Sequence, residues 1–153
     1  GTSAAVRNVV VHGVAAGILP DAVRKAESAI DMHIEGFKKA HKAGVRLAMG
    51  TDSGVPFTNH GKNLDELAYM VEMGLSPSEA ICVGTLESAK LLKMDDRVGS
   101  LEIGKLADLV VVDGNPLDDI EVLRQPERIR KVYLGGECLV DRDAGRLLLD
   151  QQA

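Results

Sequence analysis

Apolar residues recur at intervals of three and four in the first half of the chain, which is the spacing of an amphipathic helix. The pattern is clearest at Val23, Ala26, Ile30, Ile34, Phe37 and Ala40. Asp21 is the predicted N-cap of this helix, and Gly44 is its predicted end. A shorter helix is predicted over residues 64–71, ending at Gly74.

The clearest helix boundary in the chain is at Ser76. The sequence Ser76-Pro77-Ser78-Glu79 combines an N-cap serine, a proline at the first helical position and a glutamate placed to close a capping box. The apolar spacing then continues. We expect this helix to extend to about Met94.

Two short apolar runs predict strands of a parallel sheet. Residues 9–11 are three consecutive valines, which favour a buried strand. Residues 45–49 are apolar except for Arg46, are too short for a helix, and are closed by Gly50. We therefore predict that residues 45–49 form a strand buried on both faces, followed by a loop over residues 51–61.

The pattern changes after Gly99. Short β-rich runs occur at residues 106–112, 129–134 and 138–140, separated by turn sequences that contain Gly114-Asn115-Pro116 and Gly135-Gly136. Such runs predict an antiparallel β unit. We therefore predict a boundary near residue 95, with a βαβα region before it and a small β region after it.

Composition narrows the classes of function. The 153 residues are 45% hydrophobic, enough for a sizeable core, but only 3% are aromatic. The net charge is −5 without a basic run, so we expect neither nucleic acid nor a membrane as a partner. No apolar run approaches the length of a membrane span, and we expect a soluble cytoplasmic protein. Cys82 and Cys138 form no CxxC pair, and both are predicted to be reduced and structural.

Asp52 is the principal candidate for chemistry, because it directly follows the predicted strand at residues 45–49. A barrel enzyme holds its catalytic groups at this end of its strands, where the loop exposes the side chain. Asp52 is therefore a candidate metal ligand or general base. The same Thr-Asp-Ser-Gly sequence also fits an ordinary Asx-turn or N-cap.

Three stretches of the chain are informative together: AGVRLAMGTDSG, NLDELAYMVEMGLSPSEAICVGTLESAKLLKM and GSLEIGKLADLVVVDGNPLDDI. They resemble the end of the amidohydrolase superfamily barrel. The resemblance implies an α/β fold, the C-terminal portion of a TIM-type (β/α)8 barrel plus part of a small β-sandwich domain. Residues 1–94 would be the last β/α units, with residues 46–50 as the eighth strand, and residues 95–153 would belong to the sandwich.

The resemblance is strongest to prolidase-like and imidazolonepropionase-like members, which hydrolyse C–N bonds in dipeptides, acylated amino acids or cyclic amides. It implies that Asp52 contacts a divalent metal, zinc, and takes a proton from the bound water. The other ligands of the family include an HxH pair, which this sequence lacks. We therefore expect a C-terminal fragment without most metal ligands, inactive by itself.

Two histidines are candidates for contact with the small amide or dipeptide substrate. His60 follows Asp52 by eight residues, and His12 lies just after the predicted strand at residues 9–11. Each also fits an ordinary surface position, and His33 and His41 are predicted to be exposed on their helix.

A different class of function is open as well. The chain is alternatively an inactive remnant that acts as an assembly or interaction module. A barrel without its first strands exposes sheet edges, which predicts a homo-oligomer. A doubly wound ligand-binding domain would fit the βαβα region but not the β-rich end.

Overall fold

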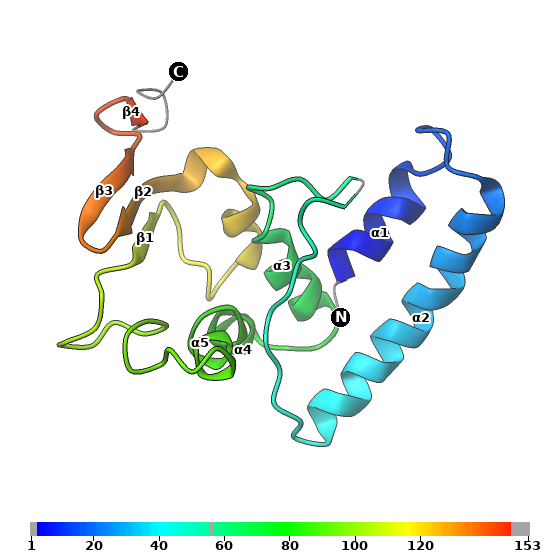
Figure 1. Cartoon of the computed structure of the whole chain (residues 1–153), viewed down its shortest axis with the longest axis horizontal. Coiled ribbons are helices and arrows are strands. Elements are labelled where there is room, and N and C mark those ends of the chain that lie inside the picture. The colour runs from blue at the N-terminus through cyan, green and yellow to red at the C-terminus, as the bar shows by residue number, and fades with distance from the viewer. Residues whose placement is uncertain (1–2, 56, 148–153) are drawn as a thin grey trace.

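The computed structural model describes residues 3–55 and 57–147, in which a group of helices leads into an antiparallel sheet (Figure 1). The hairpin of α1 and α2 lies on one side, the shorter helices lie in the middle, and the sheet lies on the other side (Figure 1). The helical half consists of α1 (Ser3–His12), α2 (Pro20–Lys42), α3 (Asp65–Glu72), α4 (Pro77–Cys82), the π-helical turn η1 (Val83–Glu87) and α5 (Ser88–Leu91). The second half consists of β1 (Leu109–Val112), the 3-10 turns η2 (Ile120–Arg124) and η3 (Pro126–Arg128), β2 (Ile129–Leu134), β3 (Glu137–Asp141) and β4 (Arg146–Leu147).

The first helix corrects the strand predicted at residues 9–11, because those residues belong to α1. Val9 is half-buried and Val11 is 69% exposed, as expected for a helix that packs on one face. That face meets α2, where a β-carbon on the buried Gly13 would lie 3.1 Å from a methyl carbon of Val23. Valine disfavours a helix by less than about 1 kcal/mol, and packing against α2 outweighs this preference.

The long helix begins at Pro20, with Leu19 in the N-cap position, two residues before the predicted N-cap. The predicted N-cap is wrong, since Asp21 lies in the first turn and pairs with Arg24. Proline fits the first helical position because its missing N–H would have no partner there. The predicted end is confirmed: Gly44 has a φ of +72°, and its N–H donates to the last turn of the helix.

Residues 45–49 do not form the predicted strand. None of them joins a sheet among the described residues, and Val45 is 55% exposed. Leu47 and Met49 are half-buried against the helical core. A strand buried on both faces needs a neighbour on each side and cover above and below. The described chain covers this segment with helices but supplies no flanking strand, so burial on both faces is wrong here.

The central helices confirm the capping prediction. The Ser76 side chain accepts from the Glu79 N–H, and the Glu79 carboxylate accepts from the Ser76 N–H, which closes the capping box. The helix continues through η1 to Leu91, close to the predicted end, and α3 ends before Gly74 as predicted. The buried core beneath these helices consists of Met70, Met73, Leu75, Ala80 and Val83.

The β region forms the antiparallel unit predicted from its short runs. The strand order is β1-β2-β3-β4, and every pairing is antiparallel. Val110 pairs with Val132, which pairs with Val140. Gly135 and Gly136 both have positive φ, as the tight turn between β2 and β3 requires. The parallel barrel and the sandwich, which concern a larger assembly of strands, stay predictions.

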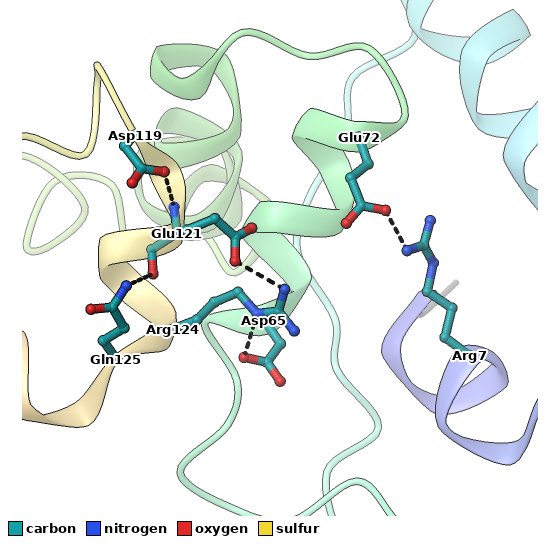
Figure 2. Close-up of polar contacts among 7 residues, drawn as sticks. All are labelled: Arg7, Asp65, Glu72, Asp119, Glu121, Arg124 and Gln125. Carbon is teal, nitrogen blue, oxygen red and sulfur yellow. Dashed lines mark hydrogen bonds and ion pairs between the residues drawn. The ribbon is translucent and has the colours of Figure 1, made fainter. Parts of the chain in front are cut away.

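Charged side chains join α3 to α1 and to η2 of the second half (Figure 2). Arg7 of α1 pairs with Glu72 of α3, and Arg124 of η2 reaches Asp65 at the start of α3 with an N–O distance of 3.2 Å. Both guanidinium groups also lie over the Tyr69 ring of α3, 4.4 Å from its centroid for Arg7 and 5.3 Å for Arg124. Helix α3 is therefore held from both sides.

Two other predictions can be compared with the described residues. Both cysteines are free thiols, as predicted; Cys82 is exposed and Cys138 is half-buried. His33 and His41 are half-buried rather than exposed, and His41 lies 3.4 Å from the Glu79 carboxylate.

Among the described residues, helices long and apolar enough to cross a membrane are absent.

Candidate functional site

The loop between the helical core and α3 carries Asp52 in an unusual backbone conformation. Asp52 has a φ of +47° and is exposed. Aspartate is one of the few side chains that enters this left-handed region without large strain. Next to it, the hydroxyl of Ser53 donates to the Asn63 side-chain oxygen at 2.8 Å, which ties the loop to the turn before α3. The carboxylate of Asp52 therefore lies on an exposed loop that a side-chain hydrogen bond holds in place.

His60 belongs to the same loop and folds back against Gly54. Its Nε2 atom is 3.5 Å from the position of a β-carbon built on Gly54, which is two residues after Asp52. Gly54 itself has a φ of +105°, so a side chain there would be strained even before it approached the histidine. The structure therefore brings His60 to the segment that carries Asp52.

His12 reaches this loop from α1. Its ring centroid lies 6.1 Å from that of Phe57, with the ring planes tilted by 47°. One turn earlier, the side-chain amide of Asn8 donates to the Phe57 carbonyl oxygen at 2.8 Å. All three residues predicted for the site thus belong to, or contact, the loop of residues 51–61.

Several residues of this region were missed by the sequence analysis. Asn8 and Phe57 were not singled out, because no helix was predicted around the strand at residues 9–11 and a positive φ at Phe57 has no sequence signal. Thr58 and Glu66 are buried, with 5% and 1% of their surfaces exposed. A threonine in a loop and a glutamate in the first turn of a helix are ordinary sequence features. The sequence therefore does not mark their burial.

The described residues do not by themselves make up a metal site. Within residues 3–55 and 57–147, groups of three or more His, Cys, Asp or Glu side chains that could hold an ion are absent. Catalytic zinc is ordinarily held by three protein ligands. Asp52 could supply one carboxylate ligand, but the residues described around it do not complete such a set.

A cavity of about 420 Å³ lies at the far end of the loop, between the start of α3 and the sheet. Apolar side chains such as Val110, Val132 and Val140 form much of its wall, and Lys62 and Arg142 contribute charge. The residues predicted for the site do not line it. Its size is that of a small-molecule pocket, but it is separate from the candidate chemistry around Asp52.

The helices, the antiparallel sheet and the aspartate-bearing loop define an α/β protein. The model of the amidohydrolase family matches residues 2–139, and the chain belongs to this family. The resemblance seen in the sequence is therefore confirmed.

The matches to curated relatives extend over most of this chain but over only a part of each relative. The chain is 32% identical over 123 residues to ochratoxinase from Aspergillus niger, which covers 79% of this chain and 25% of the relative. It is 30% identical over 116 residues to imidazolonepropionase from Streptococcus pyogenes, which covers 72% of this chain and 26% of the relative. The chain thus spans about a quarter of the length of these relatives.

Solved structures of prolidases are similar as well. A Xaa-Pro dipeptidase with bound methionine superimposes with a TM-score of 0.75 and 40% identity, covering 89% of this chain and 33% of that protein. A prolidase complexed with N-methylphosphonate-L-proline superimposes with a TM-score of 0.80 and 28% identity, covering 92% of this chain and 34% of that protein. The similarity again falls on about one third of each relative.

Proposed function

We propose that this chain is the C-terminal part of a metal-dependent amidohydrolase that cleaves C–N bonds in dipeptides, acylated amino acids or cyclic amides. The observation that carries the proposal is the family match over residues 2–139. Similarity to a Xaa-Pro dipeptidase at 40% identity favours dipeptides within this class. In the complete enzyme, residues 1–94 would be the last β/α units of the barrel and residues 95–153 would belong to the β-sandwich.

In this proposal Asp52 is the catalytic residue and His60 and His12 contact the substrate. A carboxylate on an exposed loop can accept a proton from the attacking water and pass it to the leaving nitrogen. His60 lies against Gly54 and His12 against Phe57, so both are near the segment that presents the carboxylate. Asp52 would also be one ligand of a divalent metal, zinc, whose other ligands would come from the rest of the complete protein.

The reading frame upstream of Gly1 gives the first test, because the proposal expects it to encode an HxH pair. The second test assays the protein of that complete frame with Xaa-Pro dipeptides. Removing a general base typically lowers kcat by about 100-fold to 10,000-fold, so we expect Asp52→Asn to have this effect. The exposed Asp95 provides the matched control, since Asp95→Asn removes the same charge outside the loop. An Asp52→Asn variant with undiminished kcat would refute the catalytic role.

A second candidate function is that of an assembly module, and it rests on the edge of the sheet. Among the described strands β1 lies at an edge, with Val110 and Val111 exposed by 51% and 40%. An exposed apolar edge strand can pair with another chain. If the chain is an assembly module, it should sediment as a dimer or larger oligomer at micromolar concentration, and its Val111→Lys variant should sediment as a monomer. A monomeric unmodified chain would count against it.

A further inference from the structure

Two residues with side chains hold a left-handed backbone in the loop that carries Asp52. Their φ angles are +47° at Asp52 and +66° at Phe57. Aspartate tolerates this region, whereas the bulky side chain of phenylalanine crowds the neighbouring carbonyl group. Such a conformation persists when surrounding contacts determine it. The contacts around Phe57 therefore decide the shape of the loop.

Those contacts include one face of α1. The Asn8 side-chain amide donates to the Phe57 carbonyl oxygen at 2.8 Å and lies 3.5 Å from the Thr58 hydroxyl. His12, one turn later on α1, sets its ring 6.1 Å from that of Phe57. Residues four apart lie on the same face of a helix, so a single face of α1 meets the loop.

Hydrogen bonds inside the loop extend this constraint to Asp52. The Thr58 carbonyl oxygen accepts from the Gly54 N–H at 2.8 Å, and the Thr58 N–H donates to the Val55 carbonyl oxygen at 3.0 Å. The Val55 N–H in turn donates to the Asp52 carbonyl oxygen at 3.3 Å. Thr58 is only 5% exposed, so this end of the loop is fixed in the interior. A shift at Phe57 would therefore move the backbone of Asp52.

Asn8 is otherwise an unfavourable residue for its position. It lies in the middle of α1, where asparagine disfavours the helix and alanine would favour it. We propose that Asn8 is a positioning residue, whose amide holds the Phe57 carbonyl and thereby keeps the loop in the conformation that presents Asp52. The inference rests on the proposed function for its catalytic meaning, while the structural role can be measured without any activity.

Backbone amide exchange and chemical shifts, recorded by NMR on this chain, test the proposal. Asn8→Ala removes the donor and the polar shape, and Asn8→Asp keeps the shape but removes the N–H groups. Both variants lose the hydrogen bond from Asn8 to the Phe57 carbonyl, which should let the loop open more often. We therefore expect exchange at the Gly54 amide to become about tenfold faster, the usual effect of losing one hydrogen bond. We also expect both to shift the backbone resonances of Asp52, which report its positive φ.

Val11→Ala is the matched control, because Val11 is an exposed residue of the same helix and alanine raises helix propensity there too. It should leave the Gly54 amide and the Asp52 resonances unchanged. Unchanged exchange and shifts in both Asn8 variants would overturn the proposal. Loss of protection along all of α1 in both variants would overturn it as well, since it would reveal a general role in stability. Retained activity in Asp52→Asn, by contrast, would refute the proposed function and leave these measurements unaffected.

Discussion

Replacing Tyr69 tests how α3 is held against α1 and η2. The guanidinium groups of Arg7 and Arg124 lie over its ring, 4.4 Å and 5.3 Å from the centroid, and only 9% of the residue is exposed. The two arginines also pair with carboxylates of α3 (Figure 2). Tyr69→Leu keeps an apolar side chain in the core but removes the aromatic face from both cations.

The expected change in the free energy of unfolding follows from the burial of the two arginines. A cation over an aromatic ring contributes about 0.5–1 kcal/mol at an exposed site and about 2 kcal/mol when it is desolvated. The side chains of Arg7 and Arg124 are 22% and 31% exposed, so each contact falls between these limits. We therefore expect Tyr69→Leu to lower the free energy of unfolding by about 2 kcal/mol more than Tyr69→Phe, which keeps the ring.

Urea denaturation followed by far-UV circular dichroism measures this difference. With a denaturant slope of about 2 kcal/mol per molar for a domain of this size, the midpoint of Tyr69→Leu should fall about 1 M below that of Tyr69→Phe. Equal midpoints for the leucine and phenylalanine variants would refute the reasoning. That result would mean that the guanidinium groups are held by their carboxylate partners and gain nothing from the ring.

Four further outcomes are expected. Ser76→Ala removes the capping box of α4 and should lower the free energy of unfolding by about 1 kcal/mol in urea denaturation. Gly99→Ala should lower the melting temperature measured by calorimetry, because φ is +94° and the new β-carbon would lie 2.7 Å from that of Ala89. Burial raises the pKa of Tyr69 above 10.0, so the unfolded chain ionises first and stability should fall above pH 10, a slope that Tyr69→Phe reduces in urea titrations. The hydrogen bond from Lys131 lowers the pKa of Asp141 below 3.8, so its contribution should be lost as acid titrates the folded carboxylate, and Lys131→Met should flatten the acid limb.

Helix ends that depend on local chemistry could be predicted from the sequence. The start at Ser76 and the stop at Gly44 each depend on groups within a few residues, and both are confirmed. The turn at Gly135-Gly136 is predictable for the same reason, because the β2–β3 hairpin needs positive φ where glycine adopts it freely. In these places a short piece of sequence contains every group that decides the conformation.

The strands predicted at residues 9–11 and 45–49 are absent because a strand depends on neighbours that lie elsewhere in the chain. Three valines at residues 9–11 fit a strand and also a helix face, and the packing of α1 on α2 decides between them. Residues 45–49 have the composition of a central strand, but the described chain offers helices as their partners. Periodicity over so few residues cannot distinguish these cases.

In the candidate site, too, features that depend on nearby residues could be predicted, and those that depend on distant residues could not. Asp52 could be selected from its place after a short apolar run, and the proximity of His60 to its loop follows from their separation of eight residues. The support of that loop by Asn8 could not be predicted, because it joins residues about fifty positions apart through a helix that the sequence pattern assigned wrongly. Long-range contacts, rather than the identity of the aspartate, were the unpredictable part.

Family membership and the formation of one strand are separate physical questions. Asp52 was predicted to follow a barrel strand, yet that strand is not formed, while the family match extends over residues 2–139. A ladder requires hydrogen-bonding partners, and this chain spans about a quarter to a third of its relatives. The order that remains around Asp52 must therefore come from contacts within the chain. In the described residues α1 supplies such contacts at Phe57, which is why the orientation of Asp52 should depend on Asn8 even where the preceding segment lacks a sheet.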